Sequence, residues 1–96
     1  MNTNTKREVL AVFTHPVRDY AAWRKVFDAA APMQQAMGII GVEVFQDPND
    51  PNKVIVVDRD PDMATLEKYL ANPDLKEAMT KAGVTSPPTV LIGLAT

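Results

Sequence analysis

Hydrophobic residues recur along this chain at two spacings, one typical of strands and the other of helices. Residues 8–14 are mostly apolar and end at a proline-containing turn, which predicts a buried strand. Asp19 then has the short carboxylate of a helix N-cap. Tyr20, Trp23 and Phe27 follow it at steps of three and four, so they fall on one face of a predicted helix.

This first helix is predicted to run to about Met37, where Gly38 is a natural residue to end it. Pro32 falls inside that span. Proline removes a helical hydrogen bond and clashes with the preceding turn, so we expect a kink or break near Ala30 or Ala31.

Two further strands are predicted at residues 39–46 and 53–59, the second of them rich in β-branched side chains. The six residues between them, 47–52, are a dense turn signal, and they predict an antiparallel hairpin.

Two short helices are predicted next, because Asp60-Pro61 and Asn72-Pro73 each combine an N-cap with proline at the first helical position. Gly83 would close the second of these helices, and residues 89–94 form the last predicted strand. The inward-facing positions of the two helices would be Leu66, Tyr69, Leu70, Leu75 and Met79.

The resulting order is strand, helix, strand, strand, helix pair, strand. It predicts an α+β fold of the ferredoxin-like, split βαβ kind, with a four-stranded antiparallel sheet and helices on one face.

The predicted strands are apolar on both faces, although helices can cover only one. In the first strand one set of alternate positions holds Val9, Ala11 and Phe13, and the other holds Leu10 and Val12. Residues 53–57 and 89–94 show the same two-sided pattern. Because an exposed apolar sheet face is unusual for a monomer, we expect a homodimer in which two open sheet faces form a shared core.

Three motifs strengthen this expectation: Asp19-Tyr20-x-x-Trp23-x-x-x-Phe27-Asp28, the Asp-Pro-x-Asp-Pro-Asn-Lys hairpin of residues 47–53, and Leu75-Lys-x-Ala-Met79-x-x-Ala-Gly-Val84 followed by Pro87-Pro88. Together they make residues 9–94 resemble the dimeric α+β barrel superfamily, and within it the small proteins similar to antibiotic biosynthesis monooxygenases. The resemblance implies a dimeric α+β barrel. It also implies one of several activities, among them cofactor-free monooxygenation, cyclisation and isomerisation.

Composition narrows the classes of function. The chain has 96 residues, 46% of them hydrophobic, a net charge of −2 and no cysteine. We therefore expect residues 8–96 to form one domain, and the polar residues 1–7 to be a disordered tail. Thiolate chemistry is excluded, no basic face for nucleic acid is apparent, and no apolar run is long enough for a membrane helix, so a cytoplasmic protein is expected.

His15 and Tyr20 are the candidate catalytic residues. His15, the only histidine, lies in a predicted turn before the first helix and has an ordinary pKa suited to proton transfer near neutral pH. Tyr20 would offer a hydroxyl to the same volume. Alternatively, His15 simply bonds the backbone of the turn, and Tyr20 packs in the core.

Trp23, Phe27, Glu43 and Asp58 are the candidate substrate-binding residues. Trp23 and Phe27 could stack on a flat ligand, or they could only pack the helix against the sheet. Glu43 and Asp58 stand in apolar strands, where burial would raise a carboxyl pKa. Alternatively, they lie near the strand ends, where they are exposed to solvent. One histidine and scattered carboxylates predict no metal site. The superfamily includes haem-handling enzymes, but these need an axial histidine on a helix and His15 lies in a predicted turn, so no cofactor is expected.

Two functions remain open at this point. One is a small cofactor-independent enzyme, a monooxygenase or a cyclase/isomerase, that acts on an aromatic or polyketide-like molecule. The other is a non-catalytic homodimeric module that binds a small ligand or serves in assembly.

Overall fold

The computed structural model describes residues 7–96, which form four strands and four helices. In chain order they are β1 (Val9–Pro16), α1 (Tyr20–Ala29), α2 (Ala31–Ala36), β2 (Gly41–Asp47), β3 (Asp50–Asp60), α3 (Met63–Leu70), α4 (Pro73–Lys81) and β4 (Thr89–Leu94). The predicted disordered tail, residues 1–7, lies outside the described residues apart from Arg7.

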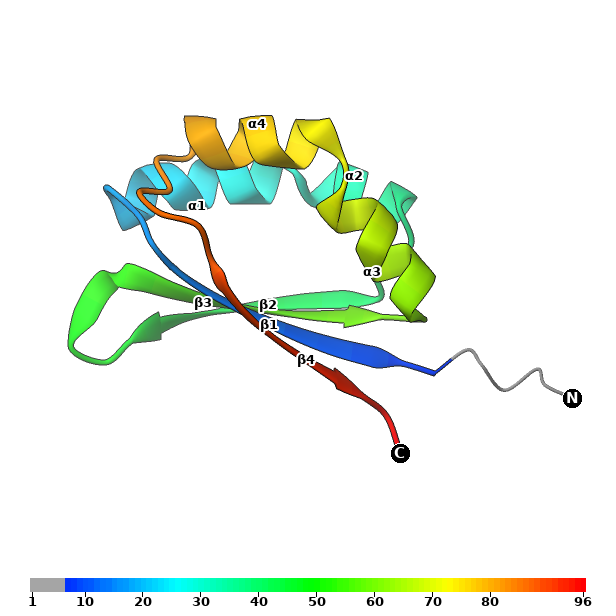
Figure 1. Ribbon diagram of the computed structural model, residues 1–96. Helices are drawn as coiled ribbons and strands as arrows, with labels where there is room; N and C mark the ends of the chain where they lie inside the picture. Colours follow the sequence, from blue (N-terminus) through cyan, green and yellow to red (C-terminus); the bar gives the residue numbers. More distant parts are fainter. Residues whose placement is uncertain (1–6) are drawn as a thin grey trace, which may run out of the picture.

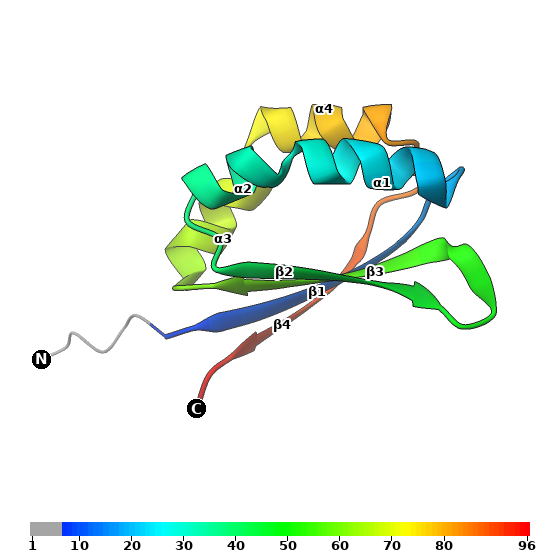
Figure 2. The same ribbon diagram turned by 180° about the vertical axis from the view of Figure 1, so that it is seen from behind.

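The four strands form one antiparallel sheet in the order β2-β3-β1-β4. Helices α1 and α4 lie side by side above the sheet, and both views show the helical layer on one face only (Figures 1 and 2). This is the predicted ferredoxin-like α+β fold.

The first predicted helix is divided into two helices, α1 and α2, just before Pro32. The Asp19 carboxylate accepts a hydrogen bond from the amide of Ala22 at 3.1 Å and caps α1, which ends at Ala29. Ala30 separates α1 from α2, and Pro32 stands in the first turn of α2, where a missing amide hydrogen removes no helical bond. Gly38 follows α2 with a φ of 94°, a backbone conformation that other residues rarely adopt. The predicted break near Ala30 is confirmed.

Two predicted boundaries were wrong. β3 begins at Asp50, so the hairpin connection is shorter than the six residues expected, and the Asp47 carboxylate accepts the amide of Asn49 within it at 2.8 Å. Asp60 belongs to β3, where it pairs with Val9, and the N-cap of α3 is Asp62. At this end the strand is therefore one residue longer than predicted and the N-cap lies two residues later, because pairing with β1 continues to the start of that strand.

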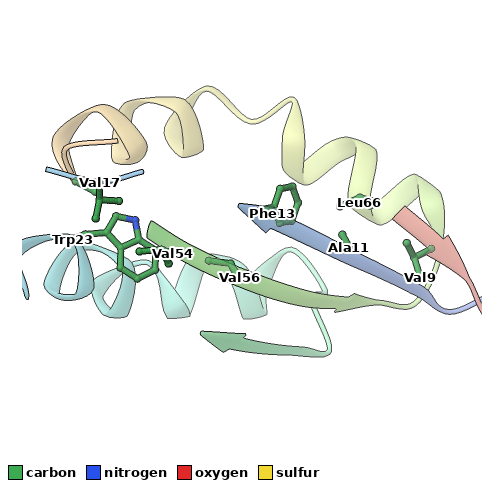
Figure 3. Packing of buried hydrophobic residues seen from close by; sticks show 9 residues of the cluster. Val9, Ala11, Phe13, Val17, Trp23, Val54, Val56 and Leu66 are labelled. Atoms are coloured by element: carbon green, nitrogen blue, oxygen red, sulfur yellow. The ribbon is translucent and has the colours of Figure 1, made fainter. Parts of the chain in front are cut away.

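The hydrophobic core lies between the helices and the covered face of the sheet (Figure 3). Its buried members are Val9, Ala11, Phe13, Val17, Trp23, Val54, Val56, Leu66 and Ala82. On the other face apolar side chains are left half-buried or exposed: Leu10, Val12, Phe45, Ile55, Val57 and Leu91. No helix among residues 7–96 lies over that open face (Figure 1).

Candidate functional site

A cavity of about 100 Å³ lies between the helical layer and the sheet. All four helices and strands β1 and β3 contribute to its walls, most of which are apolar. Four polar side chains interrupt this lining: His15, Gln34, Asp58 and Tyr69. No lysine or arginine of the described chain lines it.

Aromatic rings form one wall. Trp23 and Phe27, one turn apart on α1, stack with ring centroids 4.8 Å apart and 21° between their planes. Trp23 also lies 5.8 Å from the ring of His15, and Phe13 of β1 faces the same space. The helical spacing of Trp23 and Phe27 therefore produces a flat apolar surface beside the cavity.

His15 lies in β1 and not in a turn as predicted, because the strand continues through Pro16 and pairs His15 with Val54. The alternation of β1 points His15 toward the helices, as it does Phe13, and only 7% of His15 is exposed. Neither ring nitrogen has a hydrogen-bond partner within residues 7–96. Burial lowers the pKa of His15, so the imidazole is neutral near pH 7 and its nitrogens are available to a ligand.

Asp58 lies at the other end of the cavity. It stands on β3 opposite Ala11, faces the helices and is 2% exposed. Burial, reinforced by the neighbouring negative charge of Asp60, raises the pKa of Asp58 to about 7. A carboxyl group with this pKa can both accept and return a proton near neutrality.

The buried pair Gln34–Tyr69 is a feature that sequence reasoning missed. The Gln34 side-chain amide donates to the Tyr69 hydroxyl oxygen at 3.3 Å. Because that oxygen is already an acceptor, the hydroxyl hydrogen is left to another acceptor. Burial raises the pKa of Tyr69 to about 12, so Tyr69 remains a donor near neutral pH. Tyr69 is among the inward-facing positions predicted for the helices, but no signal in the sequence indicates that its hydroxyl meets the side chain of Gln34.

His15 and Asp58 act at different ends of the cavity. His15 pairs with Val54, which lies four residues before Asp58 on β3. Four residues of a strand span about 13 Å, so the two groups are no hydrogen-bonded dyad. A ligand held by both would need an apolar body with polar atoms at its ends.

Two predicted site residues do not line this cavity. Glu43 pairs with Val57 on the open face of the sheet and is exposed, so the sheet separates it from the cavity. Tyr20 is half-buried and packs against Trp23 at 5.9 Å, and its hydroxyl accepts a bond from Arg24 at 3.4 Å. Arg24 also forms an ion pair with Asp28 at 3.0 Å.

Within residues 7–96 no cluster of three or more histidine and carboxylate side chains is arranged to hold a metal ion. None of the helices in that part of the chain has the length and hydropathy of a membrane span.

Residues 8–81 match the sequence profile of a family described as Antibiotic biosynthesis monooxygenase. No curated protein matches the chain by sequence.

Solved structures resemble it closely in fold and only distantly in sequence. A protein of Caulobacter crescentus CB15 named after the same family is 17% identical with a TM-score of 0.80, over 96% of this chain and 92% of that one. A Bordetella bronchiseptica protein of the same name is 14% identical with a TM-score of 0.80, over 95% and 99% of the two chains. SnoaB of Streptomyces nogalater, a cofactor-independent oxygenase, is 21% identical with a TM-score of 0.72, over 94% and 92%.

Proposed function

Because the chain belongs to the antibiotic biosynthesis monooxygenase family, we propose that it is a cofactor-independent oxygenase of a small, uncharged aromatic molecule. The observation that carries this proposal is a buried carboxyl group, Asp58, at the end of an apolar, aromatic-walled cavity. Such a base can ionise a weakly acidic organic substrate without any metal or flavin. The description of SnoaB as a cofactor-independent oxygenase supports the same reaction class.

The first step is removal of a proton by ionised Asp58 from a methylene group that an aromatic ring and a carbonyl acidify. The Tyr69 hydroxyl, oriented by Gln34, donates to the carbonyl oxygen on which the negative charge collects. The mostly apolar walls lower the local dielectric constant, which strengthens that hydrogen bond.

Dioxygen is the co-substrate. The carbanion reduces dioxygen and forms a carbon–oxygen bond, and protonated Asp58 returns its proton to the resulting peroxide. Loss of the second hydrogen from the same carbon then breaks the oxygen–oxygen bond and releases water. The methylene carbon becomes a carbonyl, one oxygen atom stays in the product and the other leaves in water, so electrons and atoms balance.

The remaining polar and aromatic groups bind the substrate. Trp23 and Phe27 stack against its ring, and the unpartnered nitrogens of His15 are left for a substrate long enough to extend from Asp58 to the other end of the cavity. The cavity limits substrate size, because a 150 Å³ apolar cavity accommodates benzene and this one measures about 100 Å³. Even a single ring therefore needs more room than this conformation offers, and outward movement of Met79 on α4, which lies on the wall, would provide it.

The active form in this proposal is a homodimer. Six apolar side chains lie on the open sheet face. One of them, Leu91 on the edge strand β4 beside β1, is 70% exposed. Pairing two such faces across a two-fold axis would bury this patch in both copies and leave the helix-side cavities separate.

Oxygen consumption tests the proposal. Purified protein, freed of metals by chelation, is mixed in an oxygen electrode with neutral single-ring benzyl ketones, in which a methylene group lies between the aromatic ring and the carbonyl. We expect the wild-type protein to consume oxygen in the presence of some of these compounds, and Asp58→Asn to abolish this oxygen uptake. Glu43→Gln, which removes a carboxylate from the opposite face of the sheet, should retain it.

The alternative function, a module that binds without turnover, gives a different result. Trp23 fluorescence would then respond to aromatic compounds while oxygen uptake stayed at the background rate for all of them, and Asp58→Asn would leave that background unchanged.

A further inference from the structure

Asp60 is a second buried acid whose surroundings the catalytic proposal leaves unexplained. It stands on β3 opposite Val9, with a fully buried side chain. Neither carboxyl oxygen has a hydrogen-bond partner within residues 7–96. Burying an ionised carboxylate without partners is costly, so such a group is retained as the neutral acid or serves a purpose.

Asp60 faces the same way as Asp58. Residues two apart on a strand point to the same side, and their Cα atoms lie about 7 Å apart. Both carboxyl groups therefore enter the same low-dielectric layer between sheet and helices, where like charges interact strongly.

No positive charge of the described chain compensates them there. Of the neighbours on the same strand, Arg59 points to the open face, where its guanidinium lies 3.7 Å from Glu8. The paired positions on β1 are Ala11 and Val9, and the position on β2 opposite Asp58 is Val42. Helix α3 places Tyr69 on the buried side and the N-cap residue Asp62 nearby, while its charged residues Glu67 and Lys68 are exposed. Helix α2 contributes the uncharged Gln34.

We propose that Asp58 and Asp60 form a buried acid pair that carries at most one negative charge at neutral pH, with Asp60 as a positioning residue that keeps a proton available to Asp58. This inference rests on the proposed function for its purpose, but the pair itself is a property of the ligand-free protein. Burial raises the pKa of both groups, and the charge of each neighbour raises it further, that of Asp60 for Asp58 and that of Asp62 for Asp60.

The pair explains two features of the site. The base that ionises the substrate must later return a proton to the peroxide, and a carboxyl coupled to a second acid is half-protonated near neutrality, where both steps are fast. The pair also disfavours anionic ligands. With one negative charge present and no lysine or arginine on the cavity walls, a carboxylate or phosphate ligand would be repelled. Substrates of this site are therefore neutral when they bind.

Carbon-13 NMR of the aspartate carboxyl groups tests the pair directly in the full-length protein without substrate. In the wild type we expect the signals of Asp58 and Asp60 to titrate together in two steps, the upper one near neutral pH. Two independent single-step titrations, both near the ordinary pKa of aspartate, would overturn the inference. Because the titration uses the wild-type protein, its result does not depend on whether a variant folds.

Removal of one partner gives the second reading. In Asp60→Asn the titration midpoint of the Asp58 carboxyl group should fall by about one pH unit or more, which is the size of interaction that defines coupled sites. Glu43→Gln is the matched control, because it removes a carboxylate one strand away but across the sheet, and it should leave the Asp58 midpoint in place. An unchanged midpoint in Asp60→Asn would also overturn the pair.

The same variant separates this inference from the proposed enzyme activity. If oxygen uptake exists, the acid limb of its pH profile should move down with the Asp58 midpoint in Asp60→Asn, while a purely structural role of Asp60 would lower the rate at all pH values equally. If no compound supports uptake but the two-step titration is present, the enzyme proposal fails and the acid pair stands.

Discussion

Replacing Asp58 by asparagine should make the protein more stable at pH 8 than at pH 4, relative to wild type. The side chain keeps its size and loses its charge. The folded-state pKa of Asp58 is raised above its unfolded value, so its contribution to stability is fully present below the unfolded pKa and is lost as pH rises through the folded pKa. Asparagine, which does not titrate, escapes that loss.

The magnitude follows from the shift. Burial and Asp60 raise the pKa of Asp58 from 3.8 to about 7, a difference of about 3 units. At 1.36 kcal/mol per unit this corresponds to about 4 kcal/mol between pH 4 and pH 8. Any cost of burying the asparagine amide is the same at both values of pH, and it cancels when the two measurements are subtracted.

Urea unfolding at a series of pH values measures this difference, with protein concentration held constant because subunit association would shift the midpoint. The difference in unfolding free energy between Asp58→Asn and wild type should grow steadily from pH 4 to pH 7 and then level off. If the difference did not change with pH, Asp58 would ionise in the folded protein as easily as in the unfolded chain, and its carboxyl group would not be the buried base proposed for the site. Glu43→Gln, an exposed position on the opposite face of the sheet, is the control variant for this series.

Three further predictions concern other parts of the molecule. Leu91→Lys, which places a charge on the open sheet face, should convert a dimer into a monomer in sedimentation velocity; a wild-type monomer at micromolar concentration would contradict the shared sheet core. Pro32→Ala should change the free energy of unfolding by less than about 1 kcal/mol, because Pro32 already stands in the first turn of α2; a gain of several kcal/mol would show a strained helix. Trp23 fluorescence should respond to small aromatic ligands, and His15→Ala should weaken those that carry a hydrogen-bonding group; if Trp23→Ala instead costs about 3–5 kcal/mol while no ligand alters the emission, the volume beside it serves packing alone.

Most of the fold could be predicted because its signals are local. The periodic positions of α1, the N-cap Asp19, the break at Pro32 and the glycine after α2 each follow from a few neighbouring residues. The errors arose where tertiary pairing decided the outcome. Asp60 carries a good capping signal, yet β1 runs alongside it and draws it into the sheet.

The candidate site was predicted less completely, for the same reason. Trp23, Phe27, Asp58 and His15 line one cavity, although His15 reaches it from a strand and not from a turn. Tyr20 follows the helical period but does not line the cavity, and its hydroxyl accepts a hydrogen bond from Arg24 instead. The contact between Gln34 and Tyr69 joins residues 35 positions apart, and only the packing of α2 against α3 brings them together.

The buried acids connect stability to function in this fold. A core of this size gains little from Asp58 and Asp60, because desolvation of carboxyl groups without cationic partners opposes folding as soon as they ionise. Hydrophobic residues of similar volume at these two positions would remove that penalty and extend the core already formed by Val54 and Val56 on the same face of β3. Under the proposed function this loss of stability has a use, because a carboxyl group that titrates near neutral pH beside the aromatic cavity can both take up and return a proton.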